Sequence, residues 1–135
     1  MALSDKARAF LEEPRFAVLA TINPDGTAQQ TVMWYLVRDG YIVMNTRRGR
    51  RKDRNMLRDR RVSICIEDGF RYVAMSGEIT LVEERPQAQA DILEMAIRYD
   101  GKERGEASSR DVFSKQERIS IHLPIANVDE HGFDD

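Results

Sequence analysis

Apolar residues in most of the chain form short runs between turn signals, a pattern typical of β-strands. The first run covers 16–22, and the NPDG turn at Asn23–Gly26 ends it, because proline fixes one backbone dihedral and glycine accepts a positive one. Further strands are predicted at 27–37, 41–46, 62–67, 70–83, 118–123 and 125–128. Asp-Gly pairs at 39–40 and 68–69 predict hairpin turns. Gly77, alone inside its strand, predicts a bulge or a bend.

Helical spacing marks three other segments. Ser4–Glu13 has Ser4 as N-cap and ends before Pro14, and a short basic helix is predicted to begin near Arg50. A long helix is predicted over Arg85–Tyr99, with its buried side formed by Ala90, Leu93, Ala96 and Ile97. We expect a mobile loop at 101–109, one helical turn at 111–114 and a frayed tail at 129–135.

The order of these elements predicts a mainly β (α+β) fold. Six or seven strands joined by tight turns favour an antiparallel sheet, closed or half-closed into a small barrel with helices on its outside. The length of 135 residues predicts one domain over 1–135, in which 1–14 forms the N-terminal helix.

Composition adds little to this fold but narrows the chemistry. A net charge of -2 with 33% charged residues describes an ordinary globular protein, and the sequence has no apolar run long enough to cross a membrane. The charged N-terminus resembles no signal peptide, so a cytoplasmic location is expected. Cys65 is the only cysteine and is interpreted as a small core residue. His122 and His131 lack metal-ligand spacing, so no metal site is expected.

Positive charge is concentrated in one stretch between two predicted strands. Nine of the 21 Lys and Arg residues are Arg47, Arg48, Arg50, Arg51, Lys52, Arg54, Arg58, Arg60 and Arg61. Free backbone N–H groups and the helix dipole favour an anion at a helix N-terminus, and added cationic side chains strengthen that preference. Arg50, Lys52 and Asn55 are spaced to face one phosphate or polycarboxylate. The alternative is a solvated basic helix that keeps the protein soluble.

The remaining motifs favour a bound organic cofactor that carries the reaction. The sequence offers no P-loop, no GxGxxG and no obvious catalytic triad or carboxylate pair. The polar run Gln29–Thr31 breaks strand alternation and could face a ligand, a partner subunit or solvent. Trp34 and Tyr72 could line a slot for a planar ring or belong to the core. A single-stranded nucleic-acid groove is a further alternative, disfavoured by the acidic balance of the chain.

Taken in order, FAVLATINPDGT, TVMWYLVRDGYIVMNT, the RxKxxN motif and LRDRRVSI resemble the pyridoxamine 5′-phosphate oxidase-like split β-barrels. The resemblance covers Phe10 to about Val82 well and is greatest for the branch that uses the deazaflavin coenzyme F420. It implies an FMN-binding type of split barrel and a homodimer with cofactor sites at the subunit interface. True pyridoxamine phosphate oxidases carry an Arg-containing C-terminal segment that has no counterpart here, so vitamin B6 oxidation is not expected.

The resemblance also implies the roles of individual residues. Arg50, Lys52 and Asn55 would hold the cofactor phosphate, while Tyr72 would lie near the site from its own or the neighbouring chain, and Trp34 would wall the substrate pocket. The other implied cofactor contacts are Gln30, Thr31, Val32, Met33, Asn45, Thr46 and Arg47.

The expected function is hydride transfer between coenzyme F420 and a small conjugated organic substrate. The deazaflavin is preferred to FMN because its glutamate tail needs cationic partners, for which Arg47, Arg48, Arg51 and Arg54 are available. The alternatives are an FMN-dependent oxidoreductase of the same fold and a non-enzymatic protein that binds a cofactor or haem. No nucleic-acid or membrane partner is expected.

Overall fold

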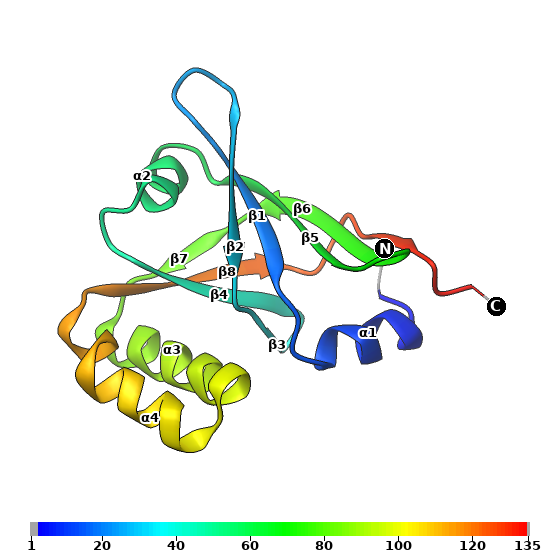
Figure 1. Ribbon diagram of the computed structural model, residues 1–135. Coiled ribbons are helices and arrows are strands. Elements are labelled where there is room, and N and C mark those ends of the chain that lie inside the picture. The colour runs from blue at the N-terminus through cyan, green and yellow to red at the C-terminus, as the bar shows by residue number, and fades with distance from the viewer. Residues whose placement is uncertain (1–2, 135) are drawn as a thin grey trace.

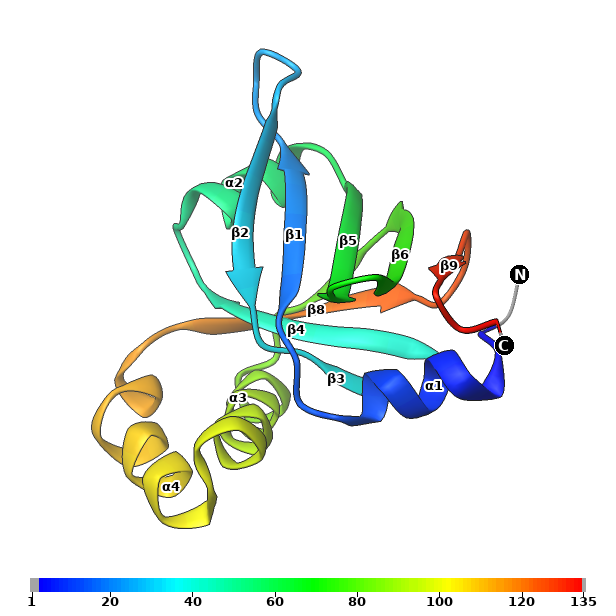
Figure 2. The same ribbon diagram turned by 45° about the vertical axis from the view of Figure 1, so that its right-hand side comes forward.

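The computed structural model describes residues 3–134 and divides their strands between two sheets that cross one another (Figures 1 and 2). The larger sheet has the order β2-β1-β5-β6-β9 and the smaller one has the order β3-β4-β8-β7. Every pairing in this part of the chain is antiparallel, as predicted. The two sheets form a split barrel, with the helices on its outside.

The elements have the following bounds. The strands are β1 (Ala17–Ile22), β2 (Ala28–Met33), β3 (Leu36–Arg38), β4 (Tyr41–Arg47), β5 (Arg61–Asp68), β6 (Arg71–Glu78), β7 (Thr80–Val82), β8 (Arg118–Pro124) and β9 (Asp129–His131). The helices are α1 (Asp5–Glu12), α2 (Arg51–Arg58), α3 (Arg85–Asp100) and α4 (Lys102–Asp111), followed by the 3₁₀ turn η1 (Phe113–Lys115).

Local chemistry accounts for several of these boundaries. The Ser4 side chain accepts a hydrogen bond from the Ala7 N–H and caps α1 as predicted. Asp39 and Gly40 both have positive φ, at 49° and 81°, which is the conformation that a two-residue hairpin between β3 and β4 requires. The core lies between the sheets, where inward-facing aliphatic residues such as Leu19 and Ile121 are fully buried.

Two strands that the sequence pattern predicts as continuous are each divided between the sheets, so residues 3–134 form nine strands rather than the expected six or seven. The segment 27–37 leaves one sheet after Met33 and enters the other at Leu36, because Tyr35 turns inward and is completely buried. The segment 70–83 changes sheet at Ile79, whose N–H donates to the Arg60 carbonyl. Gly77 itself pairs regularly with Val62 inside β6, and the change of sheet follows two residues later, so the predicted bend lies near Gly77 rather than at it.

The C-terminal third differs most from the sequence prediction. The expected mobile loop at 101–109 is wrong, because this segment is the helix α4. A Cβ at Gly105 would lie 2.6 Å from the Ile97 nitrogen, so only glycine lets α4 pack this closely on α3.

The last strand also differs from its predicted position. It covers Asp129–His131 rather than 125–128, and it pairs with β6, so this part of the tail is not frayed. Phe133 packs edge-on against Phe10 at 5.2 Å, while Asp135 lies outside the described residues.

The buried face of α3 also differs from the prediction. Ala90 is exposed, whereas the helix buries Ala88, Asp91, Ile92, Met95 and Ala96. The sequence pattern does not indicate this buried face because a charged residue, Asp91, lies within it. The burial of Asp91 depends on its ion pair with Arg38 of β3, which is distant in the sequence. Within residues 3–134, no helix is long and apolar enough to cross a membrane.

Candidate functional site

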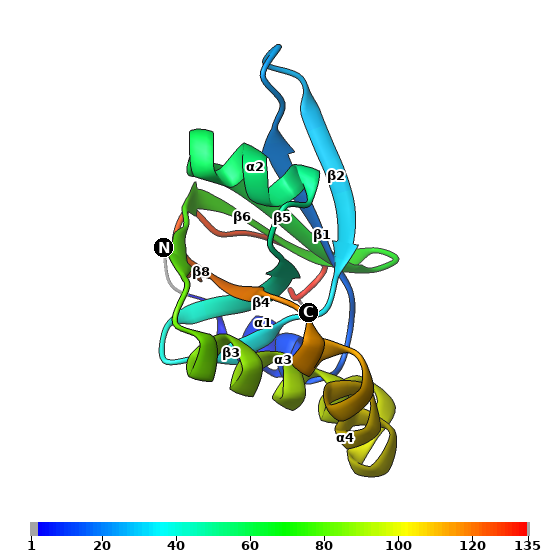
Figure 3. The same ribbon diagram turned by 90° about the vertical axis from the view of Figure 1, so that its left-hand side faces the viewer.

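One cleft brings together most of the predicted site residues. It encloses about 270 Å³, and its lining comes from β2, β4, β8, the start of α2, α3 and η1. The lining residues are Val32, Met33, Trp34, Asn45, Thr46, Arg47, Arg50, Lys52, Ile92, Met95, Phe113 and Arg118. Figure 3 shows α2 on one side of the β4 and β8 strands and α3 on the other.

The basic stretch reaches this cleft because α2 begins at Arg51, so that Arg50 and Lys52 lie at the end of the helix that borders the cleft. Gly49 has a φ of 93°, which redirects the chain out of β4, and Arg50 is the N-cap. Asp53, at the third helical position, accepts a 2.7 Å hydrogen bond from the Gly49 N–H. Asp53 also forms an ion pair with Arg48 at 3.1 Å. Lys52, in the first turn, lines the cleft.

Lys52 is the central cation of the cleft. Only 7% of its surface is exposed, and its ammonium has no hydrogen-bond or ion-pair partner within residues 3–134. Burial lowers the pKa of Lys52, and the neighbouring Arg50 and Arg118 lower it further. A partly desolvated cation that opens into a cleft without a counter-ion favours an anionic ligand there.

Three arginines surround Lys52, and none of them pairs with a carboxylate in the described part of the chain. Arg47 and Arg118 face each other directly across the β4–β8 ladder, an arrangement in which like charges repel. Burial, with Arg50 and Arg47 nearby, lowers the pKa of Arg118 to about 10. Arg118 is still protonated at neutral pH, and an anion between these groups would relieve their repulsion.

An apolar wall faces this cationic group. Trp34 stacks on Tyr99 with ring centroids 5.1 Å apart and planes 5° from parallel, and Tyr99 stacks in turn on Phe16 at 5.6 Å. Ile92, Met95 and Phe113 complete the wall. The cleft therefore combines a site for anions with a surface suited to a flat ring.

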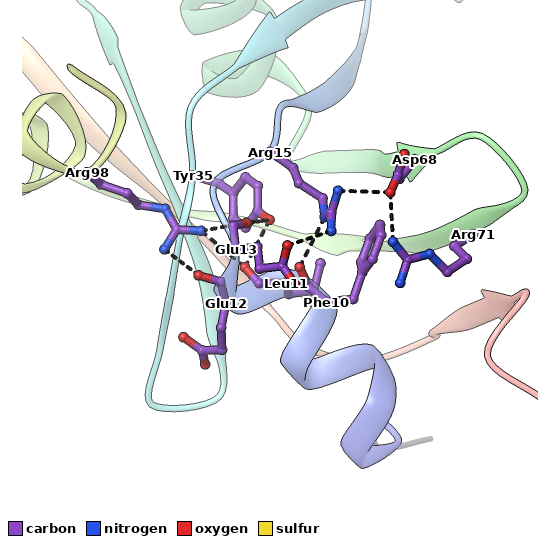
Figure 4. A network of polar contacts seen from close by, with 9 residues as sticks. All are labelled: Phe10, Leu11, Glu12, Glu13, Arg15, Tyr35, Asp68, Arg71 and Arg98. Atoms are coloured by element: carbon purple, nitrogen blue, oxygen red, sulfur yellow. Dashed lines mark hydrogen bonds and ion pairs between the residues drawn. The ribbon is translucent and has the colours of Figure 1, made fainter. Parts of the chain in front are cut away.

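A polar network fixes the backbone beside Trp34 (Figure 4). The Tyr35 hydroxyl donates to the Leu11 carbonyl at 3.0 Å, and burial raises the pKa of Tyr35 to about 12. Arg98 of α3 donates to the carbonyls of Leu11, Glu12 and Glu13, each at 3.1 Å. These bonds tie the end of α1 and the segment that carries Trp34 to α3.

Four predicted cofactor residues do not line this cleft. Asn55 is buried on the other side of α2, where it donates to the Thr21 hydroxyl at 3.0 Å and the Asn23 side chain at 3.1 Å. These bonds use its amide to tie α2 to β1, and its predicted contact with the cofactor phosphate stays a prediction.

The other three lie on the larger sheet. Gln30 lines a hollow on the outer face of this sheet, and Tyr72 of β6 stacks on His131 at 5.0 Å. Thr31 is half-buried in β2, and its hydroxyl has no partner within residues 3–134.

The sequence analysis missed four residues of the cleft, namely Ile92, Met95, Phe113 and Arg118. Arg118 carried a detectable signal, because it starts an alternating strand in which Arg118, Ser120 and His122 share one face. Ile92 and Met95 lie on the face of α3 that was assigned incorrectly. Cys65 is also not a core residue: it lies on the outer face of β5, where burial raises its pKa.

The residues of the cleft fit a phosphate attached to a planar ring. Lys52, Arg50 and Arg118 offer charge-assisted donors to phosphate oxygens, and the unsatisfied Lys52 ammonium is the direct sign that a counter-ion belongs there. Among residues 3–134, no group of His, Cys, Asp and Glu side chains is arranged to hold a metal ion.

A small antiparallel split barrel with a cationic, aromatic-walled cleft defines the class of FMN-binding split barrels. The sequence profile described as pyridoxamine 5′-phosphate oxidase matches residues 3–119. Because this match covers most of the chain, the protein belongs to the pyridoxamine 5′-phosphate oxidase family.

Solved structures share the fold over most of their length. The conserved hypothetical protein Rv2991 from Mycobacterium tuberculosis is 29% identical, with a TM-score of 0.82 over 98% of this chain and 87% of that one. A structure described as an F420 reductase is 25% identical, with a TM-score of 0.74 over 90% and 94% of the two chains.

A third structure supports the fold alone. It is a pyridoxamine 5′-phosphate oxidase-related, FMN-binding protein from Nostoc punctiforme PCC 73102, 19% identical, with a TM-score of 0.61 over 86% of this chain and 73% of that one. The comparison with curated protein sequences finds no match.

Proposed function

We propose that this protein is an oxidoreductase that uses coenzyme F420 to exchange a hydride with a small conjugated organic substrate. The observation that carries the proposal is the largely buried Lys52 side chain, whose ammonium has no partner within residues 3–134 and lies near Arg50 and Arg118 in a cleft that Trp34 also lines. The similarity to a structure described as an F420 reductase supports the deazaflavin over other phosphate-bearing ligands.

The residues of the cleft would divide the work between two sides. Lys52, Arg50 and Arg118 would hold the cofactor phosphate by charge-assisted hydrogen bonds, with Arg47 at the rim. Trp34, Met95 and Phe113 would exclude water from the ring and leave room for an apolar substrate. When bound, the deazaflavin itself supplies the hydride chemistry, so the protein groups position and polarise.

Two of the four arginines expected to meet the F420 tail already have partners within the chain. Arg48 is occupied by Asp53, Glu83 and Glu117, and Arg54 donates to the Gly49 carbonyl at 2.7 Å. Arg47 and Arg51 have no such partner among residues 3–134, and they are the remaining candidates for tail carboxylates. FMN, which has one phosphate and no tail, is therefore the second candidate cofactor.

We infer that the functional unit is a homodimer. The cleft of one chain, at about 270 Å³, lies below the usual range of about 300–1,000 Å³ for sites of this kind. The outer face of the larger sheet exposes an apolar row, described below, that a second copy would cover. Such a partner would complete the cleft and could bring Tyr72 to it.

The first test is a fluorescence titration of the purified protein with F420 and with FMN. We expect F420 to bind more tightly, and Lys52→Ala to weaken binding about 10- to 100-fold, the cost of losing a charged hydrogen bond. Lys102→Ala, which removes an exposed lysine of α4, is the matched control and should bind like the wild type.

Each contrary result rejects a different part of the proposal. Tighter binding of FMN would reject the deazaflavin, and unchanged affinity in Lys52→Ala would place the ligand elsewhere. Tight binding without turnover across a panel of reductants and unsaturated substrates would indicate a protein that stores or sequesters its cofactor.

A further inference from the structure

A continuous chain of hydrogen bonds runs from the buried face of α3 to the cationic cleft. The Asp91 carboxylate, 1% exposed, accepts a 2.6 Å bond from the Ser120 hydroxyl. Ser120 accepts a 3.2 Å bond from the side-chain amide of Asn45. The Asn45 carbonyl oxygen accepts a 2.9 Å bond from Nε of Arg118, which lines the cleft.

The direction of each bond in this chain follows from Asp91. Its Oδ1 accepts from Arg38 and from Gln87, both at 2.8 Å, and its Oδ2 accepts from Ser120. A carboxylate can only accept, so the single Ser120 hydrogen is committed to Asp91 and the Ser120 oxygen must act as an acceptor toward Asn45.

The orientation of the Asn45 amide is then determined. Its nitrogen has two acceptors, the Ala88 carbonyl at 2.9 Å and the Ser120 oxygen, so its carbonyl oxygen must face Arg118. A flipped amide would direct its own N–H groups at the Arg118 guanidinium. The negative charge of Asp91 therefore fixes the position of the Asn45 carbonyl oxygen, which is the acceptor for Arg118 at the cleft.

We propose that Asp91 and Ser120 are positioning residues that hold the Arg118 guanidinium in the cleft by fixing the Asn45 amide. Arg118 needs such a constraint because Arg47 and Arg50 repel it and no carboxylate in the described part of the chain pairs with it. Its other bonds are to the Gln116 side chain at 2.8 Å and to the face of Phe113. The proposal rests on the phosphate role of the cleft given under Proposed function.

A purely structural role for Asp91 makes a different prediction. Asp91 also forms an ion pair with Arg38 that joins α3 to β3, and losing it would loosen the fold without regard to the ligand's charge. The affinity for a ligand would then fall equally whether or not that ligand carries a phosphate. The ratio between a phosphorylated ligand and its phosphate-free alcohol separates the two roles.

The test compares the affinities of FMN and riboflavin, which differ only in the phosphate, and in parallel those of F420 and its deazaflavin alcohol, which lacks both the phosphate and the glutamate tail. Ser120→Ala interrupts the series of hydrogen bonds but leaves the ion pair between Asp91 and Arg38. Asp91→Asn makes the hydroxyl hydrogen of Ser120 available to Asn45. We expect both variants to lower affinity for the phosphorylated ligand about tenfold and to leave the alcohol unchanged. Glu94→Gln is the control, because Glu94 contacts the same Arg38 at 2.8 Å but lies outside the chain.

The outcomes distinguish a failure of the positioning role from a failure of the proposed phosphate site in the cleft. A ratio that falls in Lys52→Ala but not in Ser120→Ala or Asp91→Asn overturns the positioning role and keeps the phosphate site. Equal loss of both ligands also overturns it, in favour of a structural role. A ratio unchanged in Lys52→Ala shows that the cleft holds no phosphate, and both proposals fail. If Asp91→Asn does not fold, Ser120→Ala decides.

Discussion

At the scale of single residues, Lys52 is the most informative position in the chain. Its surroundings go against the alternative of a solvated basic helix, since 93% of its surface is covered while its charge has no partner in the described residues. A lysine whose pKa is lowered by folding binds fewer protons in the native state than in the unfolded one. Stability of the ligand-free protein should therefore rise as the pH increases through the window between the lowered value and 10.5.

This reasoning predicts how phosphate alone should affect thermal unfolding at pH 7. Inorganic phosphate should raise the melting temperature of the wild type, by on the order of 10 °C at a hundredfold excess over Kd, which corresponds to about 2.7 kcal/mol. Lys52→Met should start from an equal or higher melting temperature, because it removes an unpaired buried charge, and should gain much less from phosphate. A drop in the baseline of Lys52→Met, or an equal gain, would contradict the assignment. Differential scanning calorimetry measures both quantities.

At the scale of elements, the end of α1 depends on a helix far away in the sequence. The last carbonyls of a helix have no partner within it, and here Arg98 of α3 supplies three donors to them. Arg15 adds a 3.2 Å bond to the Phe10 carbonyl and lies over the Phe10 ring (Figure 4). Because Tyr35 joins the same network, α1 and the segment that carries Trp34 are held as one unit.

Removing the three hydrogen bonds from Arg98 to the end of α1 should loosen both α1 and the aromatic wall formed by Trp34. Arg98→Met keeps an apolar side chain but loses the three donors and the guanidinium that lies over the Tyr35 ring, and we expect the free energy of unfolding to fall by about 2–3 kcal/mol in urea titrations. Arg110→Met is the control, since Arg110 is exposed on α4, and it should change stability by less than about 0.5 kcal/mol. Equal stability of both variants would show that the end of α1 does not depend on Arg98.

At the scale of the whole molecule, the outer face of the larger sheet is the surface suited to a second copy. Val18 lies opposite Val32 on one side and Cys65 on the other, and Cys65 lies opposite Ala74, so the register forms a row across the sheet. Val32 is 67% exposed, and a hollow of about 300 Å³ lies over the remainder of the row. An exposed apolar row with polar residues beside it, such as Gln30 and Ser63 of the same hollow, is typical of an interface between subunits.

The row predicts the state of association. Sedimentation velocity of the wild type should give a dimer, and Val18→Arg should shift it to the monomer, because the substitution places a charge within an apolar interface. Val112→Arg is the matched control, since Val112 is similarly apolar, 48% exposed and located beyond α4. A wild-type monomer at micromolar concentration, or a Val18→Arg dimer, would rule out this face as the interface.

Sequence reasoning succeeded where local chemistry decides the structure. The Ser4 cap, the Asp39-Gly40 hairpin and the start of α2 after Gly49 each depend on residues a few positions apart, and all three occur as predicted. It failed where a distant partner reverses a local preference. Tyr35 interrupts a predicted strand because its hydroxyl reaches α1, and Asp91 is buried because Arg38 neutralises it.

The sequence by itself determined the order of most strands, the positions of α1, α2 and α3, the tight turns and the concentration of cations before β5, since periodicity, dihedral preferences and charge are properties of neighbouring residues. Only the tertiary structure decided which of those cations face the cleft. Arg48 and Arg58 are occupied elsewhere, whereas Lys52 and the distant Arg118 meet with no counter-charge in the described residues. The physical reason is that a cationic side chain becomes a binding group when folding removes its water and supplies no partner, and both conditions depend on residues far apart in the chain.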